Sequence, residues 1–332
     1  MSISTLIKTL PKTELHLHIE GSLEPALMWQ LAQKHNIELP YDSVAAIEAA
    51  YQFSDLQSFL DIYYAGADVL RDEDDFYQLM WAYLSRCHEE NIVHTEIMFD
   101  PQTHTERGVG YDIFMPGFLR AIDQAKAEFG ISVQLILSFL RHLSEEDAFD
   151  TLAAAEAWYP HIDAFGLDSS ELGHPPEKFK RVFDKVRAQG FKIVAHAGEE
   201  GPAEYIWQAI DLLQVDRIDH GVRCQEDSAL LERVKQEQIP LTVCPLSNLK
   251  LKVIDDMRQH NILQLLDEGL LVTVNSDDPT YFGGYLNENY EQLHQALGMT
   301  EDQLKALVIN SFKASFLPET EKQQWIAKVD AL

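Results

Sequence analysis

Two histidines near the start of the chain, His16 and His18, are spaced so that they could bind one metal ion. They lie in residues 13–22, where apolar and polar residues alternate as in a buried strand. Side chains two positions apart on a strand share a face, so both imidazoles point the same way. Neutral imidazole is a good ligand for zinc, iron or nickel. One such pair among 13 histidines is weak evidence by itself.

The same kinds of residue recur where later strands are expected to end. His196 and Glu199 stand in Val-Ala-His-Ala-Gly-Glu-Glu, His220 in Asp-His-Gly, and Asp277 in Asn-Ser-Asp-Asp-Pro. Each motif alone has an ordinary explanation. A histidine at the end of a buried strand is more often a hydrogen-bonded core residue than a ligand, and Asp-Asp-Pro is commonly just a turn. Together, at one end of a set of parallel strands, they indicate a metal-dependent active site.

Three histidines and one carboxylate satisfy a catalytic metal and leave a position for water. Glu199, three residues beyond His196, could act as general acid on a substrate beside the metal. His220 is not needed as a ligand and could orient or deprotonate the metal-bound water. A two-metal site usually needs a bridging lysine after the fourth strand, and residues 165–171 contain none. One metal is therefore expected, with the ligands His16, His18, His196 and Asp277.

The elements that must position these residues alternate between short apolar strands and helical segments. Helices are expected at 176–189, 204–213 and 227–237, among others. Eight strand–helix units in one chain favour a (β/α)8 TIM barrel, whose active site lies at the carboxyl ends of the strands. An open doubly wound sheet is the alternative, but no Gly-x-Gly-x-x-Gly follows the first strand. The later strands are expected at 92–99, 132–140, 164–168, 191–196, 217–220, 240–244 and 270–275.

A helical insertion of about residues 24–90 follows the first strand. Helices are expected at 24–35, 54–70 and 74–90, with Ser54 as a cap for the second of them. The insertion is long for a βα connection, so it is either a lid over the site or additional core. No linker or repeat divides the chain, and residues 1–332 are expected to form a single domain.

The charge of the chain argues against polyanionic partners. It carries 54 acidic and 26 basic residues, a formal net charge of −28. Such a surface repels phosphate backbones and anionic lipids, so neither nucleic acid nor a membrane is an expected partner. Three scattered cysteines and no long apolar segment fit a cytoplasmic location. The oligomeric state is left open, and a homo-oligomer is compatible with the sequence.

The series His-x-His, His-Ala-Gly-Glu, His-Gly and Ser-Asp-Asp-Pro, in this order, resembles the adenosine/adenine deaminase family of metal-dependent hydrolases. The resemblance extends from about residue 11 to residue 314. It implies a (β/α)8 fold and a single zinc ion, with iron as the alternative metal. It also implies a hydrolytic attack on C6 of a purine that releases ammonia. The resemblance implies that Glu199 is the proton donor and His220 the catalytic histidine. It also implies that Asp278 hydrogen-bonds the purine N7. The metal ligands that it implies are the four named above, His16, His18, His196 and Asp277.

Two further carboxylates suggest which purine is bound. Glu171 stands where adenosine deaminases have glycine, and Glu20 where they have aspartate. Residues 168–171 and 99–108 are similar to the members that act on the free base, adenine. Glu171 is expected to accept a hydrogen bond from the imidazole N–H of adenine and to crowd a sugar, with Glu20 narrowing the same space. The alternative for Glu171 is a cap on the following turn.

The expected reaction is therefore the deamination of adenine to hypoxanthine, with adenosine as the alternative substrate. The alternative from another functional class is a barrel that binds a metal ion without catalysing a reaction. Such a protein would not need Glu199 and His220. Zinc deaminases that act on flipped bases carry Pro-Cys-x-x-Cys, which is absent here.

Overall fold

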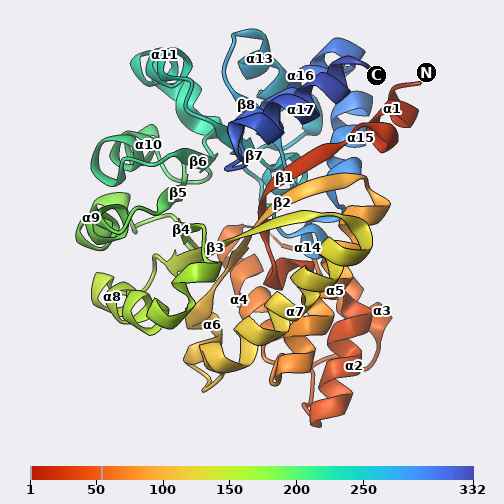
Figure 1. Cartoon of the computed structure of the whole chain (residues 1–332), viewed down its shortest axis with the longest axis vertical. Helices are drawn as coiled ribbons and strands as arrows, with labels where there is room; N and C mark the ends of the chain where they lie inside the picture. Colours follow the sequence, from red (N-terminus) through yellow and green to blue (C-terminus); the bar gives the residue numbers. More distant parts are fainter. Residues whose placement is uncertain (1, 54) are drawn as a thin grey trace.

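Eight parallel strands form the centre of the molecule, and helices follow each of them (Figure 1). The computed structural model describes residues 2–53 and 55–332. The strands pair in sequence order from first to last. They are β1 (Lys12–His18), β2 (Ile92–Phe99), β3 (Ser132–Leu140), β4 (Ala164–Asp168), β5 (Lys192–Ala197), β6 (Arg217–His220), β7 (Leu241–Val243) and β8 (Val272–Val274).

A parallel bridge between Leu17 and Asp277 connects the end of β1 to the segment after β8. This bridge brings the two outer strands of the sheet together and nearly closes the barrel. The expected (β/α)8 barrel is confirmed. The strands expected at 191–196, 240–244 and 270–275 are displaced or shorter by one or two residues at their ends.

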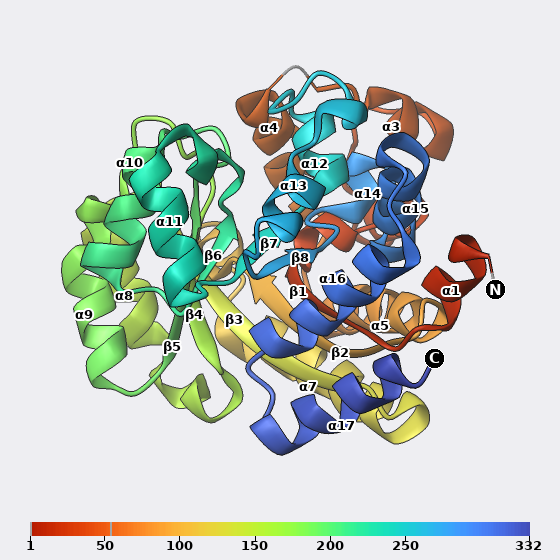
Figure 2. The same ribbon diagram turned by 90° about the horizontal axis from the view of Figure 1, so that it is seen from above.

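The helices form a ring around the strands when the barrel is seen from above (Figure 2). Both views place the two termini close to one another, beside α1 and α17. None of the helices described is both long and apolar enough to cross a membrane. Outside the insertion the helices are α1 (Ile3–Thr9), α6 (Pro101–Thr105), α7 (Tyr111–Phe129), α8 (Glu145–Ala154), α9 (Lys180–Ala188), α10 (Ala203–Gln208), α11 (Ser228–Glu237), α12 (Pro245–Lys250), α13 (Ile262–Asp267), α14 (Pro279–Phe282), α15 (Leu286–Leu297), α16 (Glu301–Ala314) and α17 (Glu319–Asp330).

The insertion between β1 and β2 is helical, as expected. The side chain of Asp55 caps α4 by accepting a hydrogen bond from the Ser58 N–H; the expected cap at Ser54 lies outside the described residues. One side of α4 faces the pocket described below, whereas α5 packs against α7. The insertion is therefore part lid and part core. Its helices are α2 (Pro25–His35), α3 (Val44–Ala50), α4 (Leu56–Ala67) and α5 (Glu73–Glu89).

The inside of the barrel holds apolar side chains and, beside them, buried charged ones. A small apolar cluster of strand residues packs against Phe316. Beside it, the buried Arg217 guanidinium donates to Glu96 at 2.6 Å and to the Leu15 carbonyl at 3.0 Å. Charges at this depth are tolerated because they are paired. The cluster consists of Met98, Ile136, Ala164 and Val194.

Candidate metal and active site

The four residues expected to bind a metal converge at the carboxyl end of the barrel. One ligand atom from each lies within 4.8 Å of the others, and all four side chains are buried. His18 Nε2 is 3.2 Å from His196 Nε2. The Asp277 Oδ1 atom is 3.3 Å from His16 Nε2 and 3.5 Å from His18 Nε2. The ligands come from β1, β5 and the turn after β8.

These separations fit a small divalent metal. Zinc bonds to nitrogen and carboxylate oxygen of about 2.0–2.1 Å, arranged tetrahedrally, separate neighbouring donor atoms by about 3.3 Å. His16 Nε2 is a buried polar atom with no hydrogen-bond partner among the residues described. Buried polar atoms are rarely left unpaired, and a metal would satisfy this one. The donor set and its geometry therefore fit a single metal ion.

A hydrogen-bond chain fixes the tautomer of His16. Thr242 Oγ1 donates to Asp219 Oδ1 at 2.8 Å, so it accepts from His16 Nδ1 at 3.0 Å. The Nδ1 atom then carries the proton, and Nε2 is free to bind a metal. Buried aspartates also face the Nδ1 atoms of the other two histidines. Asp168 Oδ2 is 3.4 Å from His18, and Asp219 Oδ2 is 3.6 Å from His196. Such partners orient metal-binding histidines and raise their basicity.

Two of the site residues have a strained backbone. His220 has φ of 63° and Asp277 has φ of 64°, in the left-handed region that non-glycine residues seldom adopt. Each residue follows or ends a short strand, and the reversal turns its side chain towards the barrel axis. Strain of this kind costs on the order of 1–3 kcal/mol and is found where function requires it.

Glu199 and His220 lie on the same side of the ligand cluster. His220 Nε2 is 3.6 Å from Glu199 Oε1 and 3.7 Å from Asp277 Oδ2. Burial raises the pKa of Glu199 well above its ordinary value, and Asp277 adds to the effect. Burial lowers the pKa of His220 to about 3. A protonated carboxyl group beside a neutral imidazole suits a proton donor and a hydrogen-bond acceptor.

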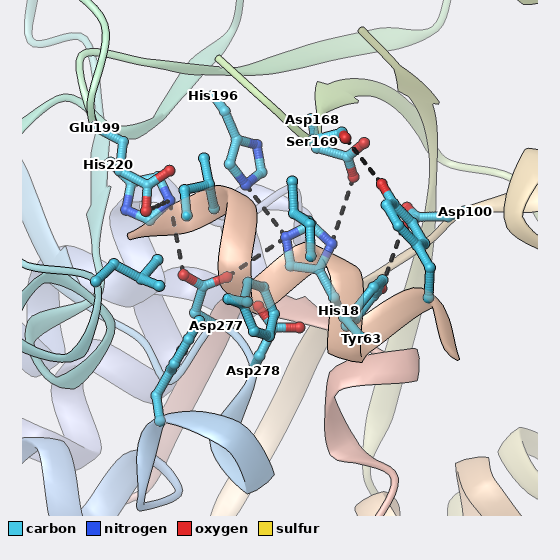
Figure 3. A pocket seen from close by; sticks show the side chains of 16 residues that line it. His18, Tyr63, Asp100, Asp168, Ser169, His196, Glu199, His220, Asp277 and Asp278 are labelled. Atoms are coloured by element: carbon cyan, nitrogen blue, oxygen red, sulfur yellow. Dashed lines mark hydrogen bonds and ion pairs between the residues drawn. The ribbon is translucent and has the colours of Figure 1, made fainter. Parts of the chain in front are cut away.

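A compact pocket lies above these residues, with about 380 Å³ of empty space when the open solvent at its mouth is included. Figure 3 shows Glu199 and His220 on one side of it, Asp100 and Tyr63 on the other, and the metal ligands between them. The α4 helix supplies much of the apolar wall. The apolar and aromatic lining residues are Leu56, Phe59, Leu60, Tyr63, Tyr64, Leu251 and Phe282.

Asp278 lines the pocket next to the ligand Asp277. Burial raises the pKa of Asp278 well above its ordinary value, which favours a carboxyl group able to donate a hydrogen bond. Gly21 allows this position, because a Cβ atom there would stand 1.8 Å from Asp278 Oδ1. Asp278 therefore lines the same pocket as Glu199 and the candidate metal ligands, and its contact with the purine stays a prediction.

Glu171 is in a different place from the one expected. Its carboxylate accepts hydrogen bonds from the main-chain N–H groups of residues 198–201, at 2.7, 3.1, 2.8 and 2.7 Å. It is fully buried and does not line the pocket. Both oxygens are used by the loop that carries Glu199, so neither is available to a purine. Glu171 does accept hydrogen bonds from the main chain of a turn, as the alternative interpretation expects. That turn is the one after β5, however, and not the one that follows Glu171 in the sequence.

Glu20 does not line the pocket either, although its Oε2 atom is 3.4 Å from the hydroxyl of the lining residue Tyr63. Its Oε1 atom accepts from His104 Nε2 at 2.7 Å and from the main-chain N–H of Asp100 at 3.2 Å. The additional methylene, compared with aspartate, allows the carboxylate to reach His104 and α6. The expected contact of Glu20 with the substrate is therefore replaced by a structural one.

Four buried residues around the candidate ligands are not among the site residues that the sequence motifs predict. Asp168 is the last residue of β4, and Asp219 is the residue before the last of β6. Their place at strand ends is the feature of the sequence that could have identified them as site residues. Asp100 follows β2 in the same way. Tyr63 lies on α4, which packs over the pocket. No local pattern in the sequence predicts that packing, so the sequence gives no indication that Tyr63 belongs to the site.

Comparison with known proteins agrees with this geometry. An adenine deaminase of Acinetobacter baylyi is 60% identical over 332 residues, covering 100% of both chains. The crystal structure of an adenine deaminase from Arthrobacter aurescens covers 97% of this chain and 99% of its own, with 45% identity and a TM-score of 0.96.

A zinc-bound amidohydrolase from Burkhoderia ambifaria covers 99% of this chain and 93% of its own, with 27% identity and a TM-score of 0.90. The sequence profile of the adenosine deaminase family matches residues 11–332, nearly the whole chain. The chain therefore belongs to the adenosine deaminase family.

Proposed function

We propose that this protein catalyses the hydrolysis of adenine to hypoxanthine and ammonia. The observation that carries the proposal is the convergence of four metal donors beside Glu199 in a compact pocket. The full-length relative from Acinetobacter baylyi, named adenine deaminase, supports the choice of substrate.

One zinc ion per chain would be held by His16, His18, His196 and Asp277, with iron as the alternative. Such a metal lowers the pKa of water and supplies a hydroxide-like nucleophile at neutral pH. The zinc-bound relative from Burkhoderia ambifaria supports zinc over iron.

The protein side chains would manage the protons of the reaction. Attack of water at C6 breaks the aromaticity of the ring unless N1 gains a proton, and the raised pKa of Glu199 keeps that proton available. Neutral His220 faces both Glu199 and Asp277 and accepts a hydrogen bond from the attacking water. The C6–N bond then breaks, the amino group leaves as ammonia, and the carbonyl of hypoxanthine remains.

The pocket walls would orient the base. The apolar side chains of α4 cover the planar ring and exclude bulk water, which strengthens the polar interactions inside. Asp278 would donate to N7, because burial favours its protonated form.

A cytoplasmic location is part of the proposal. All three cysteines are buried and free, namely Cys87, Cys224 and Cys244. Free buried thiols are typical of reducing compartments.

The direct test is ammonia release from adenine and from adenosine by purified protein loaded with zinc or with iron. We expect turnover of adenine, little turnover of adenosine, and no activity after removal of the metal with a chelator. Equal turnover of both purines would contradict the substrate choice. Metal-loaded protein that releases no ammonia would instead favour a barrel that binds metal without catalysis.

A further inference from the structure

A buried carboxyl group on β1 has no role in the mechanism above. Glu14 stands two residues before the candidate ligand His16 and is fully buried. Its Oε1 atom accepts both hydrogen bonds that Ser276 can donate, from the main-chain N–H at 3.0 Å and from the side-chain hydroxyl at 2.5 Å. Ser276 is also fully buried and directly precedes the candidate ligand Asp277. Glu14 therefore holds the residue next to a metal donor.

The other oxygen of Glu14 connects this contact to the helical insertion. The Tyr83 hydroxyl of α5 donates to Glu14 Oε2 at 2.7 Å and lies 2.8 Å from Thr95 Oγ1 on β2. Both of these residues are buried. The pairing of β1 with β2 is irregular between Glu14 and Leu17. The carboxyl group of Glu14 is thus held by the insertion as well as by its own strand.

The contact with Ser276 does not depend on the charge of Glu14. Burial raises the pKa of Glu14 to about 7, so both protonation states are populated near neutral pH. In the ionised form both oxygens accept hydrogen bonds. In the neutral form the proton on Oε2 can bond to the Tyr83 oxygen, whose own hydrogen then bonds to Thr95 Oγ1. The Oε1 atom accepts from both Ser276 donors in either form.

Asp277 needs such support because its backbone is strained. Its φ of 64° lies in the left-handed region, and strained residues persist only where their surroundings hold them. Its own N–H and carbonyl bond to the main chain of His16 and His18. The two bonds from Ser276 to Glu14 fix the preceding residue to the same strand. From this position the Asp277 carboxylate points towards the histidines (Figure 3).

We propose that Glu14 is a positioning residue, which aims the metal ligand Asp277 by holding Ser276 against β1. Without this acceptor the Ser276 donors would turn to other partners, and the strained backbone would relax. The Asp277 carboxylate would then move away from the three histidines. Glu14 would thus control metal affinity without touching the metal or the purine. The inference rests on the metal site of the proposed function and not on the choice of purine.

The test measures zinc affinity, by competition with a chelating dye, in the wild type, Glu14→Met and Glu14→Gln. Methionine has a similar shape but no strong acceptor, whereas glutamine keeps an oxygen for Ser276 and can donate to the Tyr83 oxygen. We expect Glu14→Met to bind zinc about 10–100-fold more weakly, and Glu14→Gln to stay within about threefold of the wild type. The visible absorption of cobalt-loaded protein should change only in Glu14→Met, because it depends on the arrangement of the ligands.

Two further variants separate positioning from stability. Ser276→Ala removes only the hydroxyl donor and should weaken zinc binding by less than about tenfold, and it decides the question if Glu14→Met does not fold. Glu145→Met is the matched control. Glu145, on α8, is 7% exposed and accepts the main-chain N–H groups of Arg181 and Val182 at 2.7 and 3.1 Å. Its replacement should destabilise the metal-free protein without altering zinc affinity or the cobalt spectrum.

Unchanged zinc affinity and an unchanged cobalt spectrum in Glu14→Met and Ser276→Ala, both folded by circular dichroism, would overturn the inference. An equal loss of zinc affinity in Glu145→Met would also overturn it, because general destabilisation would then explain the result. A wild type that binds no zinc would instead overturn the metal site of the proposed function. Zinc-loaded wild type that releases no ammonia from adenine would contradict the proposed reaction alone.

Discussion

The main-chain N–H of Asp277 donates to the carbonyl oxygen of His16 at 3.1 Å, and the two side chains approach within 3.3 Å. The His18 N–H returns a hydrogen bond to the Asp277 carbonyl at 3.0 Å. The backbone contact that joins the first and last strands therefore also positions three of the four candidate metal ligands, His16, His18 and Asp277. Glu14 reinforces it by accepting from the Ser276 N–H at 3.0 Å. Metal binding and barrel closure should depend on one another.

Replacement of His196 by alanine should remove the metal. A site with three of its four protein ligands binds more weakly by at least the roughly 10–100-fold that loss of an outer-sphere partner costs. Metal per chain after dialysis, measured by mass spectrometry, checks this. His35→Ala is the control, because His35 belongs to a separate, partly exposed cluster with Asp72 and Asp75. Full metal occupancy in a folded His196→Ala protein would disprove the ligand assignment.

Replacement of Glu199 by glutamine should abolish proton donation without loss of metal. General acid catalysis contributes about 10²–10⁴-fold, so kcat should fall in that range. The raised pKa of Glu199 also predicts the pH profile. The acid is present below its pKa and is lost as the pH rises through it, so wild-type kcat/KM should decline on the alkaline side.

That alkaline decline should flatten in Glu199→Gln. Glu200→Gln is the matched control, since the Glu200 side chain accepts the Leu56 N–H and lies outside the proposed proton path. A Glu199→Gln enzyme within about tenfold of wild type would mean that another group donates the proton. Glu200 would be the first residue to examine.

Replacement of Glu171 by glutamine should loosen the loop that carries Glu199. The amide can accept with one oxygen only, and its NH2 group would face main-chain N–H donors. We expect faster hydrogen exchange at residues 198–201 and a loss of kcat of about 10²-fold, the size of effect that misplacement of a catalytic group by 1 Å produces. Metal content should not change.

Glu171→Gly distinguishes this role from a contact with the substrate. Loss of the acceptor should make exchange in the loop faster still and should give no turnover of adenosine. If exchange is unchanged and adenosine becomes a substrate, Glu171 contacts the purine as the sequence analysis expects.

Replacement of Glu20 by aspartate should destabilise the fold. The shorter side chain cannot reach His104 and the Asp100 N–H together, and an unsatisfied buried partner costs about 1–3 kcal/mol. Urea unfolding of the metal-loaded protein measures the free energy. A double-mutant cycle with His104→Gln isolates the pair. Glu38→Asp, at an exposed position, is the control. A coupling energy near zero would show that the Glu20–His104 contact contributes nothing.

Local patterns predict the strands and the convergence of the four candidate metal ligands, for a physical reason. Alternating or continuous apolar runs identify strands, and a parallel barrel places all carboxyl ends together. A (β/α)8 fold therefore predicts that four residues at these strand ends lie close together, namely His16, His18, His196 and Asp277. The same applies to Glu199 and His220, which lie close behind the ends of β5 and β6.

The partners of the acidic residues could not be predicted in this way. Glu171 binds amide groups 27–30 residues further along the chain, and Glu20 binds a histidine on α6. Both contacts depend on how loops pack over the barrel, and side-chain length alone does not determine that packing.

The bridge between Leu17 and Asp277 has a consequence for synthesis of the protein. It joins residues separated by 260 positions in the chain, so a ribosome must release nearly the whole polypeptide before the bridge can form. Until then the His16–His18 pair lacks its carboxylate partner and can hold a metal ion only weakly. Tight metal binding should thus occur late in synthesis. A metal ion bound by His16, His18 and Asp277 would then link the first strand of the new protein to the segment after the last strand.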